Sequence, residues 1–167
     1  YSDLFEWQLY NAAGVGMGVE GTTYLYNNPL TCRGGVTRQA WYEVPCCPSN
    51  ISRTWADLGK YLYTNDERNV WVHQYVDSEA VIEECGGVKL KVETGLPWQG
   101  NVRIGVTPRE TREFSLHVRI PSWAKDISLR INSKRQDLPT ADLADREQTA
   151  SGYDPRVSRF FEIQRIW

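Results

Sequence analysis

The spacing of apolar residues changes near residue 65, and this change constrains the fold more than any other feature of the sequence. Before that point the spacing is helical, with one apolar stripe formed by Ile51, Trp55, Leu58 and Leu62. After it the period is two, as in 114–120, where apolar and polar residues alternate. The sequence therefore predicts an α+β chain that is helical first and mostly β afterwards.

The first 65 residues are expected to contain two helices. One covers 3–13 and ends at Gly14, while the second is capped by Ser49 or Asn50 and runs to about residue 65. The region between them is expected to hold a short strand, a further extended segment and a proline-bracketed bend: 22–26, 39–44 and 45–50.

Residues 66–167 are expected to form an antiparallel β-sandwich, because many short strands follow one another at regular spacing. The predicted strands are 70–76, 80–84, 88–93, 102–106, 114–120, 127–131 and 159–164. The polar stretch 136–154 is predicted to be a loop, and Trp98 and Trp123 are predicted to pack in the sandwich core. The domain prediction is thus 1–65 for a helical part and 66–167 for a sandwich.

Composition excludes two classes of protein. The 19 basic and 21 acidic residues leave a net charge of −2, which argues against a dedicated nucleic-acid-binding protein. No apolar run approaches the ~20 residues of a membrane span. The chain opens inside a predicted helix and closes inside a predicted strand, so we expect it to be an internal fragment of a longer protein.

Two adjacent cysteines, Cys46 and Cys47, form the sharpest chemical feature. They lie between Pro45 and Pro48, just before a helix N-terminus that favours anions such as thiolates. A bend could turn both sulfurs towards one metal ion. From the residues alone, three interpretations stay open: two buried unreactive thiols, a metal or nucleophile site, or a vicinal disulfide.

Several motifs together resemble glycoside hydrolase family 127, the β-L-arabinofuranosidase family, and also its relative, family 146. The motifs are the run 24–30, Trp41-Tyr42, the Cys-Cys-Pro-Ser-Asn block that begins at Cys46, 72–75, 97–100 and 119–124. The resemblance implies the end of an (α/α)6 barrel followed by a β-sandwich. It also implies a retaining glycosidase with one Zn²⁺ ion, acting on an arabinofuranose-type plant glycan.

The resemblance also implies roles for individual residues. Cys46 would be both the nucleophile and a zinc ligand, and Cys47 a second zinc ligand. The remaining ligands, a Glu-x-Cys motif, and the acid/base glutamate would lie upstream of this chain. Glu83-Glu84-Cys85 spells Glu-x-Cys, but it follows the cysteine pair in a β-rich stretch, so we interpret it as strand surface and a structural cysteine.

Three further residues are candidates for binding substrate: His73, Arg53 and Trp41. Since this chain would hold only one wall of the site, we expect the 167 residues alone to be inactive while the parent protein hydrolyses glycosides. The alternative is a non-catalytic β-sandwich that binds carbohydrate or serves as a structural module. Thiol reactivity at Cys46 separates the two hypotheses.

Overall fold

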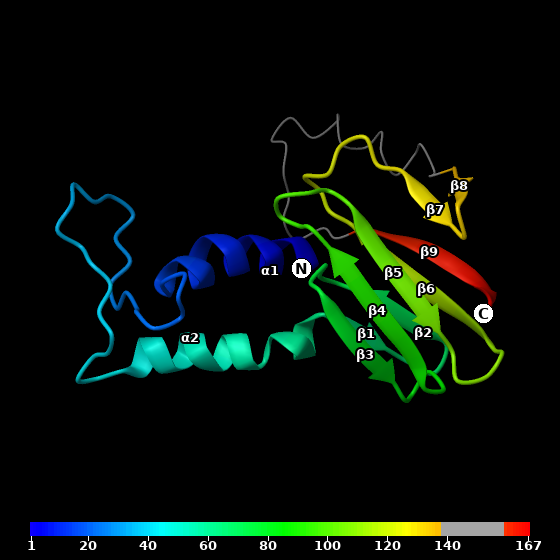
Figure 1. Ribbon diagram of the computed structural model, residues 1–167, viewed down its shortest axis with the longest axis horizontal. Coiled ribbons are helices and arrows are strands. Elements are labelled where there is room, and N and C mark those ends of the chain that lie inside the picture. Colours follow the sequence, from blue (N-terminus) through cyan, green and yellow to red (C-terminus); the bar gives the residue numbers. More distant parts are fainter. Residues whose placement is uncertain (138–158) are drawn as a thin grey trace. The chain divides into compact units, whose positions relative to one another are not determined.

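The computed structural model describes residues 1–137 and 159–167, which form two compact units (Figure 1). One unit, 4–60, is helical, and we call it the helical unit. The other, 1–3 together with 61–167, is built of β-strands, and we call it the sandwich unit. The predicted α+β class, with helices first and strands afterwards, is confirmed. The predicted loop 136–154 lies almost entirely outside the described residues.

The first helix is longer than predicted. Helix α1 covers Ser2–Gln8, continues as a π-helical turn over Leu9–Ala13 and ends in a 3-10 turn over Gly14–Gly16. Gly14 was expected to end the helix, but it keeps helical dihedrals, with φ −61° and ψ −35°. Glycine permits a helix end without enforcing one, and the chain turns extended only at Met17.

The segment between the helices contains no strand. Tyr24 forms single antiparallel bridges with Met17 and Gln39, and the predicted strand 22–26 is wrong. The sequence there has strand-forming residues, but pairing is confined to one residue on each side. A strand needs neighbours along its length, so propensity alone does not produce one.

The second helix, α2, covers Cys46–Ala56 and starts earlier than predicted. Pro45 is its N-cap, and Pro48 lies in the first turn. A proline there costs little, because the first N–H groups of a helix have no intrahelical acceptor. The two cysteines are therefore helical residues rather than part of a bend. The helix also ends sooner than predicted: a 3-10 turn over Leu58–Tyr61 follows it, and then a strand begins.

The sandwich unit contains two larger sheets and a hairpin (Figure 1). The four-stranded sheet has the order β1 (Tyr63–Asn65), β2 (Asn69–Val72), β6 (Glu113–Ile120) and β9 (Arg159–Ile166). The three-stranded sheet has the order β3 (Ser78–Ile82), β4 (Val88–Thr94) and β5 (Val102–Thr107). The hairpin joins β7 (Leu129–Ile131) and β8 (Lys134–Gln136).

One strand pair departs from the predicted antiparallel arrangement. Strands β2 and β6 are parallel, with Asn69 beside Ser115 and Val72 beside Val118. The other pairs in the described strands are antiparallel. A parallel pair needs a long connection, and here β3, β4 and β5 lie within that connection.

The core of the sandwich unit consists of apolar side chains that alternate with exposed ones, as in β4. Its buried members are Val70, Val72, Ile82, Cys85, Val88, Leu90, Phe114, Leu116, Val118 and Ile163. Trp98 and Trp123 are not among them, since they are 91% and 49% exposed. The prediction that they pack in the core is wrong, because both lie in turns that follow strand ends and not within the strands.

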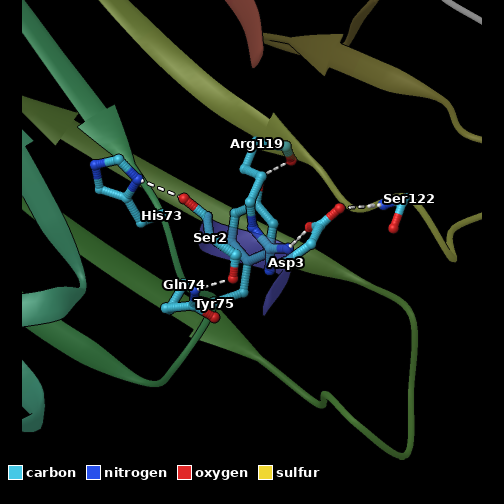
Figure 2. Close-up of polar contacts among 7 residues, drawn as sticks. All are labelled: Ser2, Asp3, His73, Gln74, Tyr75, Arg119 and Ser122. Carbon is cyan, nitrogen blue, oxygen red and sulfur yellow. Dashed lines mark hydrogen bonds and ion pairs between the residues drawn. The ribbon is translucent and has the colours of Figure 1, made fainter. Parts of the chain in front are cut away.

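A buried ion pair joins Asp3 to Arg119 of β6 (Figure 2). The second oxygen of Asp3 accepts a hydrogen bond from the Ser122 backbone N–H at 3.1 Å. Tyr75 donates its hydroxyl to the Arg119 carbonyl. The Gln74 side chain donates to the Ser2 carbonyl at 2.8 Å. These contacts explain why residues 1–3 belong to the sandwich unit although helix α1 continues into the helical unit.

Candidate active site

Cys46 and Cys47 occupy the first turn of α2, and their sulfurs lie 3.9 Å apart. Both are free thiols, and Cys46 is exposed. Two sulfurs bound to one tetrahedral zinc ion at about 2.3 Å each would lie about 3.8 Å apart. The spacing of the pair therefore suits a shared metal ion. The vicinal disulfide is not formed, since a disulfide requires about 2.0 Å between sulfurs.

A tyrosine that was not singled out from the sequence contacts the pair. The Tyr26 hydroxyl lies 2.9 Å from the Cys46 sulfur. Tyr26 is held in turn by Tyr42, whose hydroxyl accepts from the Tyr26 backbone N–H at 3.0 Å and donates to the Tyr24 carbonyl at 2.9 Å. The rings of Tyr26 and Tyr42 pack with centroids 5.3 Å apart. Two of the motifs noted in the sequence are therefore in contact beside Cys46: Tyr26 comes from the run 24–30, and Tyr42 comes from Trp41-Tyr42.

The hydrogen bonds make the two thiols unequal. The hydrogen bond from Tyr26, followed by that from Cys47, lowers the pKa of Cys46 below its ordinary value. The hydrogen bond to Cys46 raises the pKa of Cys47, and burial adds to the effect. The contact with Cys46 also raises the pKa of the Tyr26 hydroxyl to about 12. Cys46 is therefore the thiol of the pair that loses its proton first.

Helix α2 is fixed at its start by serine side chains. Ser49 donates to the Pro45 carbonyl at 2.7 Å, and Ser52 donates to the Pro48 carbonyl at 3.0 Å. Ser49 and Asn50 are thus not the caps that the sequence predicted. Asn50 instead accepts a hydrogen bond from Arg53 at 3.1 Å.

The other predicted site residues are spread over both units. Arg53 lies about two helical turns beyond the cysteine pair, in the same helix. Trp41 is half exposed and meets Tyr24 edge to face, with ring centroids 5.6 Å apart. Both belong to the helical unit, as do the cysteines. A substrate-binding role for Arg53 and Trp41 stays a prediction.

His73 belongs to the sandwich unit, and both of its ring nitrogens are engaged. Figure 2 shows its contact with Ser2. Its Nδ1 lies 2.8 Å from the Ser2 hydroxyl, and its Nε2 lies 2.6 Å from the Thr64 hydroxyl. Burial, followed by the charge of Arg119, lowers the pKa of His73. Because the ring of His73 bridges two hydroxyl groups, the structure favours a structural role for this residue. The predicted contact of His73 with substrate stays a prediction.

The other two cysteines are Cys85 in the sandwich unit and Cys32 in the helical unit. Cys85 is fully buried in the sandwich core, while Glu83 on the same turn is exposed and forms an ion pair with Arg109 at 3.0 Å. This arrangement agrees with the interpretation of Glu83 as a surface residue and of Cys85 as a structural cysteine. Cys32 is exposed. Within residues 1–137 and 159–167, no three histidine, cysteine or acidic side chains are grouped as metal ligands.

Two family models match the chain, one on each side of the change in periodicity. The model described as the catalytic domain of GH127 β-L-arabinofuranosidase matches 1–60, and the one described as the middle domain matches 69–167. The predicted division between residues 65 and 66 falls between these ranges. The assignment of the two parts to an (α/α)6 barrel and a sandwich domain stays a prediction.

Individual relatives agree with the family models. A non-reducing end β-L-arabinofuranosidase of Bifidobacterium longum is 30% identical over 151 residues, which is 80% of this chain and 23% of the relative. The structure of a GH127 β-L-arabinofuranosidase from Geobacillus stearothermophilus T6 is 32% identical, with a TM-score of 0.76. The GH127 β-arabinofuranosidase BT3674 is 26% identical, with a TM-score of 0.77.

Both structural matches cover all of this chain but only 26% of the solved chain. This chain therefore spans about a quarter of the length of the relatives that it matches. Helices of the described part are also too short or too polar to cross a membrane. By these matches the chain belongs to glycoside hydrolase family 127, the β-L-arabinofuranosidase family, and spans the end of a catalytic domain and a middle domain.

Proposed function

We propose that the chain is part of a retaining glycosidase that releases β-L-arabinofuranosyl or a related sugar, with Cys46 as nucleophile. One observation carries the proposal: Cys46 lies at a helix start beside a second thiol and a tyrosine hydroxyl, within the segment that matches a catalytic domain. Its relatives are described as β-L-arabinofuranosidases, which supplies the substrate class.

The reaction has two displacements. The Cys46 thiolate attacks the anomeric carbon, the bond from that carbon to the leaving oxygen breaks, and the oxygen takes a proton from a carboxylic acid. Water then attacks the same carbon, the carbon–sulfur bond breaks and its electron pair returns to sulfur. The proton of the water passes to the carboxylate. Two inversions give net retention. The carboxylic acid would come from a part of the protein outside this chain.

Zinc is the proposed cofactor, and Cys46 and Cys47 would hold it. Their sulfur separation fits a shared tetrahedral ion, and two thiolates are suitable ligands. When bound, zinc would keep both sulfurs deprotonated at neutral pH. Since no third ligand joins them among the described residues, the remaining ligands would come from outside this chain. The 167 residues alone would therefore be inactive.

The test uses the full-length protein with an aryl β-L-arabinofuranoside as substrate. Replacement of Cys46 by alanine is expected to lower kcat by about 1,000-fold or more, because no covalent intermediate can form. The matched control is Cys32→Ala, which removes an exposed cysteine of the same unit and should leave kcat unchanged. Nuclear magnetic resonance of the first-formed product should show the retained anomer.

Three results would overturn the proposal. Activity of the Cys46→Ala variant close to wild type would exclude this residue as nucleophile. Inverted product would exclude double displacement. A wild-type protein with no glycosidase activity that still binds arabinan oligosaccharides would favour the alternative, a carbohydrate-binding module without catalysis.

A further inference from the structure

The geometry points to Tyr26 as the residue that positions the Cys46 sulfur and stabilises it when the sugar leaves. This inference rests on the proposed function. The hydroxyl of Tyr26 lies 2.9 Å from that sulfur, which is short for a hydrogen bond to sulfur. Tyr26 lies 20 residues upstream of Cys46, on a different segment, so the contact depends on the fold and not on local sequence.

Two contacts hold Tyr26 in place, one through its backbone and one through its ring. The backbone N–H of Tyr26 donates to the Tyr42 hydroxyl, and the Tyr42 hydroxyl donates to the Tyr24 carbonyl. The two rings pack against each other with an interplanar angle of 52°. A donor held by backbone contacts and ring packing loses little freedom when it binds sulfur, so the hydrogen bond contributes more of its energy.

The contact also distinguishes the two sulfurs. The Tyr26 hydroxyl lies 2.9 Å from the Cys46 sulfur, whereas its interaction with the half-buried Cys47 is the weaker one. With one side of the Cys46 sulfur occupied by Tyr26, its remaining lone pairs have a defined direction. The tyrosine therefore specifies which of two adjacent cysteines attacks and from which side.

The hydrogen bond matters most in the second displacement. A thioether sulfur is a weak acceptor and a thiolate is a strong one, so the bond strengthens as the carbon–sulfur bond breaks. Interactions that strengthen towards the transition state accelerate that step. In the first displacement the same bond weakens as sulfur attacks carbon, which offsets the benefit of correct positioning. We therefore expect Tyr26 to accelerate hydrolysis of the glycosyl-enzyme more than its formation.

The test is Tyr26→Phe in the full-length protein, which removes the hydroxyl and keeps the ring packed on Tyr42. We expect kcat to fall about 10- to 100-fold, the range for a lost hydrogen bond to a charged group. KM should fall with it, because the covalent intermediate accumulates, so kcat/KM should change less than tenfold. Intact mass spectrometry at steady state should show the pentosyl adduct on most Tyr26→Phe molecules and on few wild-type molecules.

The matched control is Tyr63→Phe. It removes a tyrosine hydroxyl that contacts Ser78 at 2.8 Å in the sandwich unit, and it should leave both kcat and KM at their wild-type values. Single-turnover hydrolysis of the adduct provides the second measurement. Its rate reports only on folded molecules, so a partly unfolded Tyr26→Phe preparation still gives a decisive answer.

Failure of this inference differs from failure of the proposed function. If the wild type forms an adduct on Cys46 and Tyr26→Phe hydrolyses it at the wild-type rate, the role of Tyr26 is wrong and the function stands. Equal falls in kcat and kcat/KM without accumulation of adduct would also overturn it. If Cys46→Ala retains activity, the proposed function itself is wrong.

Discussion

The two units of this chain differ in how their apolar side chains are used. In the sandwich unit, ten buried residues form one continuous core that includes Leu90, which is 0% exposed. In the helical unit, the buried apolar side chains of notable size are Leu9, Tyr24 and Pro48, whereas Val19 and Leu30 are fully exposed. The unit that matches a middle domain has its own core, and the unit with the cysteine pair has almost none.

The difference indicates that the sandwich unit supplies most of the stability of the chain, whereas the helical unit carries the candidate active-site residues. A core of this kind supplies the hydrophobic stabilisation of a β-domain, which exceeds what two short helices and a loop can provide. The helical unit instead orders a few polar contacts around Cys46. Substitutions in the sandwich unit should therefore cost more stability than substitutions in the helical unit.

The largest effect is expected at the buried ion pair. Asp3→Ala leaves Arg119 buried without its carboxylate, which should cost about 3–5 kcal/mol in the free energy of unfolding of the sandwich unit. Urea denaturation of the chain measures it. Glu20→Ala, at an exposed carboxylate of the helical unit, is the control and should change the value by less than about 0.5 kcal/mol. Equal effects would show that residues 1–3 do not belong to the sandwich unit.

A smaller effect is expected from one substitution made in both units. Leu90→Ala removes a fully buried side chain from the sandwich core and should cost about 2–5 kcal/mol. Leu30→Ala removes a fully exposed one and should cost less than about 0.5 kcal/mol. Both values come from the same urea titration. A comparable loss from Leu30→Ala would contradict the contrast, because it would place a second core in the helical unit.

The smallest effect concerns pH. Since burial lowers the pKa of His73 in the folded state, the unfolded chain binds a proton at this residue more readily. The contribution of His73 to stability is therefore complete above the ordinary histidine pKa of about 6.5, and it is lost as the pH falls from there through the lowered pKa of the folded state. The sandwich unit should be less stable at pH 5 than at pH 7.5, and His73→Gln should reduce this dependence. An unchanged pH dependence in the variant would exclude His73 as its source.

Much of the fold was predictable because its signals are local. Alternation in 114–120 and 88–93 predicted strands within one residue of their observed ends. The strands 63–65 and 134–136 were missed because three residues are too few to show a period. The parallel pairing of β2 with β6 was also missed, since register between distant segments leaves no local pattern.

The sequence pointed to the residues of the candidate site but not to their geometry. Adjacent cysteines before an apolar stripe left unreactive thiols, a metal or nucleophile site and a disulfide all open, and only the family resemblance gave Cys46 its expected role. The helix start was misplaced because Pro48 was interpreted as part of a bend, although a proline in the first turn is compatible with a helix. Tyr26 was quoted within a motif, yet only the folded chain brings its hydroxyl to sulfur.

The parallel pair also has a consequence for the order in which the sandwich unit folds. Residues 82 and 88 pair across a short turn, so β3, β4 and β5 can form by local contacts within microseconds. Residues 69 and 115 must close a far longer loop before β2 meets β6. We therefore expect the three-stranded sheet to assemble early and β6 to dock late. Substitutions at the β2–β6 seam should then mainly accelerate unfolding, whereas those in β4 should slow folding.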